Sequence, residues 1–183
     1  MEGGFMPIQY GDIILVQGDD PLSKMIKSLT RSNWSHTLLA VGRGEFAQMG
    51  SLGFTVGPQS MNRPFAILRH KELMNPYSTK TRGYMNNMNQ VIEQLRVSPP
   101  RFDFIKLITL GVKLLGQNMQ ASVSAVHPGA FVCSGLVDYV YEHAGLDLLP
   151  NKDPQDTTPA NLAELASGQD PVFALVYSSI GKL

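Results

Sequence analysis

The chain contains a single cysteine, Cys133, within the stretch FVCSGLVDYV. Pro128 and Gly129 break the chain just before it. The residues that follow are apolar at helical spacing: Leu136, Val137, Val140 and Ala144. This pattern predicts a helix with Cys133 in or near its first turn. Unpaired backbone N–H groups and the positive end of the helix dipole lower the pKa of a thiol there, and the same N–H groups can bind an oxyanion.

A thiolate nucleophile needs an acid–base partner, and histidine suits this role near neutral pH. Without such a partner, a lone cysteine is simply a packing residue of the core. The sequence holds four histidines: His36, His70, His127 and His143. His143 lies about 15 Å further along the predicted helix and cannot reach the sulfur. His127 belongs to a predicted loop, and His70 follows a strand without any further signal.

His36 is the histidine with the best structural support. It opens a predicted strand in which Leu38 and Ala40 share its face, so a packed sheet would hold its ring in one orientation. A catalytic base requires such rigid support. We therefore predict that His36 is the general acid and base for Cys133.

A third candidate follows from a predicted β-hairpin around Gly42-Arg43-Gly44. A three-residue loop places Val41 opposite Glu45, which puts Gln48 on the face that carries His36. Gln48 would then be a diagonal neighbour of the histidine on the adjacent strand. The two backbones would lie about 7–8 Å apart, within reach of a long amide side chain. A two-residue loop reverses the parity and favours Glu45. Gln48 can also be an ordinary exposed strand residue.

The elements that must position these residues are predicted from hydrophobic periodicity and from turn and capping signals. Strands are expected at Asp12–Val16, on both sides of the Gly42-Arg43-Gly44 loop, and at Phe54–Val56, Phe65–Arg69 and Val172–Tyr177. Helices are expected after the turn at Gly18 to Pro21, between Ser78 and Val97, from Cys133 to a stop at Gly145, and from Thr158 through Leu165. Together they predict one α+β domain over residues 1–183, in which an antiparallel sheet or small barrel packs against the Cys133 helix.

Composition narrows the possible functions. The 183 residues are 43% hydrophobic and 16% charged, as in ordinary globular proteins, and 15 basic residues balance 15 acidic ones. The chain therefore lacks the net positive charge that favours binding of nucleic acid. One cysteine excludes an internal disulfide, and the scattered histidines lack the spacing of zinc ligands, so neither a metal nor a cofactor is expected. The N-terminal stretch lacks the pattern of a secretory signal, which predicts a cytoplasmic protein; a phage or engineered origin would leave the same pattern.

The stretch Phe104 to Leu115 is almost wholly apolar, yet it is shorter than the roughly 20 residues that span a bilayer. No transmembrane segment is therefore expected. The stretch is interpreted either as a buried helix or as an apolar wall that contacts a lipid-like substrate. Residues 116–130 are small and polar, which is typical of a mobile loop at the border of a site.

Four stretches in this order carry a resemblance to a known family: YGDIILVQGDDPLSKMIKSLTRSNWSHTLLAVGRGEFAQ, RFDFIKLITLGVKLLG, FVCSGLVDYVYEHAGLDLLP and TTPANLAEL. They resemble the permuted papain-like amidases, relatives of the NlpC-type and lecithin:retinol acyltransferase-like cysteine enzymes. The resemblance implies a circularly permuted papain-like fold, with the histidine strand before the cysteine helix. It also implies the catalytic residues Cys133, His36 and Gln48, because the third residue of the family follows the histidine by about a dozen positions.

Three positions depart from the family pattern. Gln48 replaces an acid or histidine and so can orient the imidazole without adding charge. Gly135 replaces the glutamate of a common Cys-Ser-Glu-Leu motif, and Phe102 stands where an aromatic hydroxyl is frequent. The resemblance implies a thiol hydrolase that cleaves an amide bond of a small-molecule, peptide or lipid-like acyl substrate through an acyl-thioester. The alternatives are a thioesterase or acyltransferase of the same fold and an inactive binding module, and the oligomeric state stays open.

Overall fold

The computed structural model describes residues 8–102, 130–167 and 169–181. Six strands form one antiparallel sheet in the order β4-β3-β2-β1-β5-β8. These strands are β1 (Ile13–Val16), β2 (His36–Gly42), β3 (Glu45–Gly50), β4 (Gly53–Pro58), β5 (Phe65–His70) and β8 (Phe173–Ser178). A short parallel pair is formed by β6 (Arg101–Phe102) and β7 (Ala130–Phe131). The predicted α+β class with an antiparallel sheet is confirmed, and the strand bounds agree to within one or two residues.

The helices are α1 (Pro21–Thr30), α2 (Thr79–Val97), α4 (Cys133–His143) and α5 (Pro159–Glu164), with short 3-10 turns at η1 (Lys71–Leu73) and η2 (Pro154–Asp156). Two of their starts show how local sequence sets them. Asp20 caps α1 by accepting the Ser23 N–H, and Thr158 and Asn161 form a reciprocal capping box at α5. Helix α5 ends at Glu164, a little before the predicted limit.

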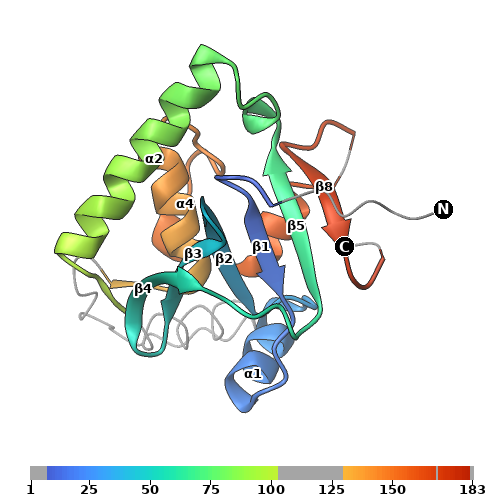
Figure 1. Ribbon diagram of the computed structural model, residues 1–183. Helices are drawn as coiled ribbons and strands as arrows, with labels where there is room; N and C mark the ends of the chain where they lie inside the picture. The colour runs from blue at the N-terminus through green and yellow to red at the C-terminus, as the bar shows by residue number, and fades with distance from the viewer. Residues whose placement is uncertain (1–7, 103–129, 168, 182–183) are drawn as a thin grey trace.

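Helix α4 lies between α2 and strands β2 and β3 (Figure 1). The predicted apolar stripe of α4 is fully buried, and it packs in one cluster with Leu39 of β2 and with Ala47 and Met49 of β3. Burial of each such large side chain stabilises the fold by about 1.5–3 kcal/mol. Gly145, with φ of +90°, follows the helix as its predicted stop.

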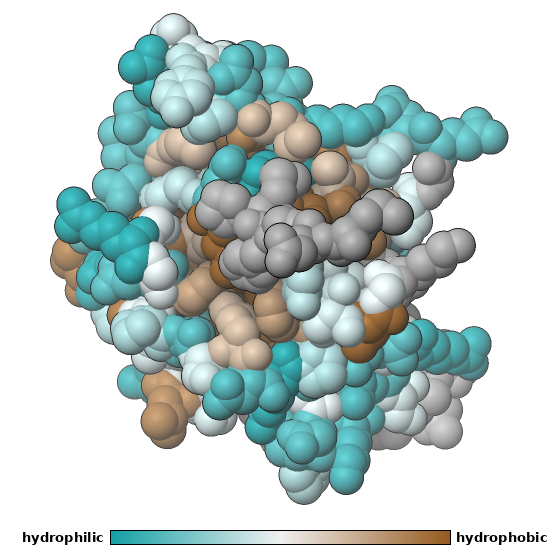
Figure 2. All heavy atoms as spheres, turned by 45° about the vertical axis from the view of Figure 1, so that its right-hand side comes forward, coloured by the Kyte–Doolittle hydropathy of each residue, from teal (hydrophilic) through white to brown (hydrophobic). Residues whose placement is uncertain are grey.

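The other face of the sheet holds a second apolar cluster, formed by Ile14, Leu38, Ala40, Phe46, Phe65 and Ile67. Side chains therefore alternate between two packed faces along the central strands. Viewed from the side on which β8 lies, hydrophobic residues gather near the centre and hydrophilic ones occupy most of the periphery (Figure 2). A strand packed on both faces is the rigid support that was predicted for His36.

The β2–β3 hairpin corrects one step of the sequence reasoning. Gly42, and not Val41, pairs with Glu45, so the loop has two residues, Arg43 and Gly44, both with positive φ. The register then shifts between Ala40 and Gly42, because Val41 is an extra residue in β2. The shorter loop alone would place Gln48 on the face of the sheet opposite His36. The extra residue at Val41 cancels that change, so Gln48 lies on the predicted face.

A buried ion pair joins β1 to β5 at the end of the sheet away from His36. Arg69 donates to both carboxylate oxygens of Asp12 at 2.8 Å, and the two side chains are 4% and 0% exposed. The hydroxyl of Tyr141 on α4 donates to the carbonyl of Gly11 beside this pair. The contacts fix the start of β1 against both β5 and α4.

Two predictions fall outside the described residues: the apolar stretch Phe104 to Leu115, and the loop 116–130 with His127, of which only Ala130 is described. In the described parts of the chain, no helix is both long and apolar enough to cross a membrane.

Candidate active site

Cys133 is the first residue of α4, as its sequence context predicted. The N-cap, Val132, offers no side-chain acceptor to the first turn. The N–H groups of the first helical residues have no intrahelical partner, so they are available to bind a group at the helix start. Cys133 is 6% exposed. The first turn therefore combines a thiol with donors that can bind an oxyanion.

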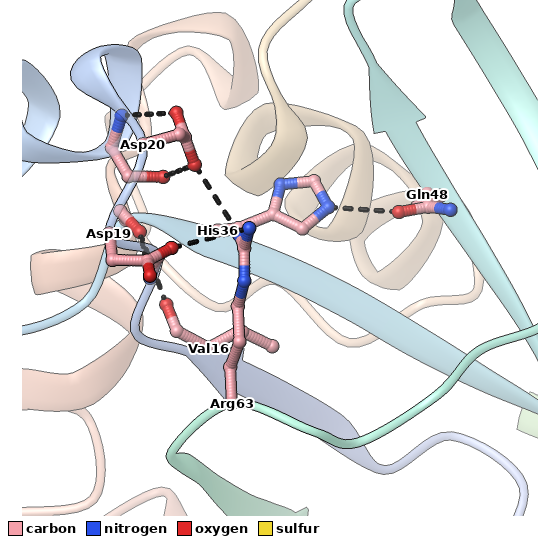
Figure 3. A network of polar contacts seen from close by, with 9 residues as sticks. Val16, Asp19, Asp20, His36, Gln48 and Arg63 are labelled. Atoms are coloured by element: carbon pink, nitrogen blue, oxygen red, sulfur yellow. Dashed lines mark hydrogen bonds and ion pairs between the residues drawn. The ribbon is translucent and has the colours of Figure 1, made fainter.

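His36 and Gln48 meet across the gap between β2 and β3. His36 Nε2 lies 2.9 Å from Gln48 Oε1, and Figure 3 shows the ring pointing toward the amide. Because an amide oxygen only accepts, we assign the proton to Nε2, which then donates to Gln48. The other ring nitrogen, Nδ1, is the atom left to interact with Cys133.

Glu45 is the alternative to Gln48, and the structure places it elsewhere. It pairs with Gly42 at the far end of β2, about 20 Å along the strand from His36. The structure thus brings together the three predicted site residues and leaves Glu45 outside.

The site favours charge separation between cysteine and histidine. Burial raises the pKa of the Cys133 thiol, but the charge of His36 and a hydrogen bond from its ring outweigh burial, and Thr37 adds smaller contributions, so the thiol pKa is lowered. Burial lowers the pKa of His36, while the charge of Cys133 and hydrogen bonds to Cys133 and Gln48 outweigh it, so the imidazole pKa is raised. Both shifts favour the charge-separated pair, a thiolate beside an imidazolium, over the neutral pair.

The chain just before His36 is anchored to the end of β1. Ser35 donates its N–H to the Val16 carbonyl at 3.0 Å, and its Oγ accepts the Gly18 N–H at 2.8 Å. Trp34 is buried beside them, with 2% exposure. These contacts hold the first residue of β2, where a strand end would otherwise fray.

An acidic and basic cluster borders His36 on the side away from Gln48 (Figure 3). Arg63 lies 3.3 Å from a carboxylate oxygen of both Asp19 and Asp20. The charge of Asp20 makes a further, smaller contribution that raises the pKa of His36. The sequence predicted a helix after the turn at Gly18 to Pro21, and nothing in the local pattern showed that α1 begins beside the histidine.

Gly135 has a steric reason to be glycine. A Cβ added there would lie 2.7 Å from the carbonyl oxygen of Pro154 in η2, so no larger side chain fits. Ser134 Oγ donates to the Thr157 carbonyl at 2.6 Å, and the Thr157 hydroxyl donates to Asp138 of α4. Hydrogen bonds and close packing thus hold the η2 segment against the first turns of the cysteine helix.

Two other histidines, His70 and His143, lie in the described part of the chain and away from Cys133. His143 is exposed near the end of α4, where its Nδ1 lies 2.9 Å from the Tyr139 carbonyl. His70 is buried in β5 against the rings of Tyr141 and Phe173, and its Nδ1 accepts the Glu72 N–H. Neither takes part in the Cys133 site. Within the described residues, no group of three or more His, Cys, Asp or Glu side chains could hold a metal ion.

Comparison with known proteins adds a similarity to a solved structure. No protein-family model matches the chain, and no curated protein matches it. The crystal structure of metalloprotein yiiX from Escherichia coli O157:H7 is similar over 94% of this chain and 89% of that chain, with 18% identity and a TM-score of 0.46.

The Gln48 contact leads to a direct test. We expect Gln48→Ala to reduce kcat/KM about ten- to a thousandfold, because the residue orients the base without reacting itself. Gln48→Glu should retain activity and shift the limb of the pH–rate profile that reports His36 to higher pH, since a carboxylate stabilises the imidazolium. Gln94→Ala on α2 is the matched control. Full activity of Gln48→Ala together with loss in Glu45→Ala would contradict the assignment.

Proposed function

We propose that this protein is a cysteine hydrolase that cleaves amide bonds through an acyl-thioester intermediate. The observation that carries the proposal is the contact set at the start of α4, where Cys133 lies beside an imidazole that Gln48 holds through Nε2. A thiol with a lowered pKa, an adjacent general acid and an oriented ring are the three parts that thiol acyl transfer requires.

The proposed reaction uses the favoured ion pair as its starting state. The Cys133 thiolate attacks the substrate carbonyl carbon, and N–H groups of the first turn of α4 stabilise the oxyanion. His36 donates its Nδ1 proton to the leaving amine as the C–N bond breaks, which leaves an acyl-thioester and a neutral imidazole. The same Nδ1 then takes a proton from water, whose oxygen attacks the thioester. Release of the acid restores the thiolate and the imidazolium.

We also propose that the fold is the permuted papain-like arrangement. The strand that carries the histidine precedes the helix that carries the cysteine, and that helix packs against an antiparallel sheet. The substrate class follows from the same resemblance: a peptide, lipid-linked or small-molecule acyl amide.

Activity-based probes test the proposed reaction. We would treat the protein with matched panels of acyl-amide and acyl-ester probes and locate adducts by mass spectrometry, with Cys133→Ala as the control. Since Cys133 is the only cysteine of the chain, a thiol adduct is unambiguous. Labelling by amide probes supports the amidase. Labelling by ester probes alone favours a thioesterase or acyltransferase, and no labelling at all favours a binding module.

The thiolate itself can be tested without a substrate. At about pH 6.5 we expect Cys133 to react with iodoacetamide at least about tenfold faster than free cysteine, whose pKa is about 8.5. The lowered thiol pKa provides more thiolate at this pH. Unfolding in guanidinium should remove the difference. A thiol that reacts only after unfolding would show that Cys133 is a packing residue.

A further inference from the structure

Thr37, the residue after His36, is the strongest unexplained feature of the site. Its side chain is 0% exposed, and its Oγ1 has no hydrogen-bond partner of ordinary geometry among the described residues. A buried hydroxyl without a partner destabilises the fold, so such a group calls for an explanation.

The sheet explains where Thr37 points. The hydrogen bond from the Ala40 N–H to the Asp12 carbonyl shows that even-numbered residues of β2 bond to β1. The backbone N–H of Thr37 is therefore directed toward β3, but the paired residues of β2 and β3 stop at Leu39 and Ala47. Thr37 lies in the gap beyond that ladder.

The side chain of Thr37 faces α4. Alternation along β2 places it on the same face as Leu39, which packs in the cluster that contains Cys133. Both the hydroxyl and the backbone N–H of Thr37 contribute to lowering the thiol pKa of Cys133, which places them near its sulfur. The hydroxyl is close enough to favour the charged sulfur, although it lacks the geometry of a formed bond to a neutral thiol.

We propose that Thr37 stabilises the Cys133 thiolate by donating its buried hydroxyl proton, together with its backbone N–H, to the sulfur. The inference rests on the proposed role of Cys133 as a nucleophile and adds a thiolate-stabilising residue to the site. The hydroxyl gains its acceptor when the sulfur becomes charged, because a thiolate accepts hydrogen bonds more strongly than a thiol. The Thr37 hydroxyl therefore lacks a hydrogen-bond acceptor only while Cys133 is a neutral thiol.

This role fits the charges around the sulfur. In the described residues, the ionisable group that interacts with Cys133 is His36, and Asp20 acts on the histidine. Gln48 adds no charge to the pair. Neutral donors on the sulfur itself therefore replace part of the stabilisation that a carboxylate third residue would supply.

The test is the pH dependence of alkylation of Cys133 in Thr37→Val, which removes the hydroxyl and keeps the shape. We expect the midpoint to move up by about one pH unit, which means about tenfold less thiolate below the midpoint. The plateau rate at high pH should rise about threefold, because a more basic thiolate is more nucleophilic. A packing defect is not expected to lower the alkylation rate of Cys133 at low pH and to raise it at high pH.

Two comparisons make the result decisive. Thr37→Ser and Thr37→Ala differ by one oxygen, so the serine variant should keep the low midpoint and the alanine variant should lose it, even where valine impairs folding. Thr81→Val is the matched control, since Thr81 is a buried threonine that donates to the Glu72 carbonyl at 2.8 Å, away from the site. Its midpoint should be unchanged.

The outcomes separate this inference from the proposed function. An unchanged midpoint in Thr37→Val and Thr37→Ala, with a low midpoint in the wild type, overturns the role of Thr37 and leaves the hydrolase proposal standing. A raised midpoint in a protein that no acyl probe labels supports Thr37 and overturns the hydrolase. An ordinary midpoint in the wild type overturns both.

Discussion

His36→Ala is expected to lower kcat/KM on an amide substrate by about 10³- to 10⁶-fold and to raise the pKa of Cys133. The variant loses the general acid that protonates the leaving amine. It also loses the charge and the hydrogen bond that outweigh burial at the sulfur, so burial then dominates and the thiol becomes the favoured form. Steady-state kinetics and the alkylation midpoint measure the two effects separately.

His143→Ala is the matched control for this variant. His143 is exposed near the end of the same helix, so its loss should leave both turnover and the alkylation midpoint nearly unchanged. His70 is a poorer control, because its buried ring packs on Tyr141 and Phe173 and its loss should reduce stability. Substantial turnover by a folded His36→Ala protein would rule out His36 as the acid and base.

The second large effect is on stability. Asp12→Ala is expected to lower the free energy of unfolding by about 3–5 kcal/mol, because it leaves the buried guanidinium of Arg69 without its carboxylate partner. For a chain of this size the loss corresponds to a Tm lower by about 10 °C. Thermal unfolding followed by circular dichroism measures the change.

Lys71→Ala is the control, because it removes an ion pair with Asp170 in which the two side chains are 50% and 94% exposed. Its cost should stay below about 1 kcal/mol. The double variant Asp12→Leu with Arg69→Met should recover part of the lost stability, since it removes both buried charges together. If Asp12→Ala costs no more than Lys71→Ala, the buried pair is not a major contributor to stability.

Helix α4 both carries the candidate nucleophile and makes contacts that stabilise the fold. The helix carries Cys133 at one end, and near the other end the Tyr141 hydroxyl donates to Gly11 next to the buried ion pair. Ser134 and Gly135 in its first turn hold the η2 segment closely. The position of the sulfur relative to β2 therefore depends on contacts made along the whole helix.

The sequence alone predicted most of the described elements and two of the candidate site residues, Cys133 and His36. The spacing of apolar residues after Cys133 predicted α4 and its buried face, because helical periodicity is a local property of the chain. Capping residues such as Asp20 and Thr158 set helix starts by bonds within three residues. His36 could be selected because the strand that it opens is apolar on its own face.

Only the tertiary structure decided how these groups meet. The hairpin loop was predicted one residue too long, and the bulge at Val41 compensated for that error, so Gln48 reached His36 through a register that no local rule specified. The positions of Thr37 and Asp20 beside the candidate site, and the steric need for Gly135, were not predicted. Each arises where segments distant in the sequence come together, and periodicity and capping report only on neighbours along the chain.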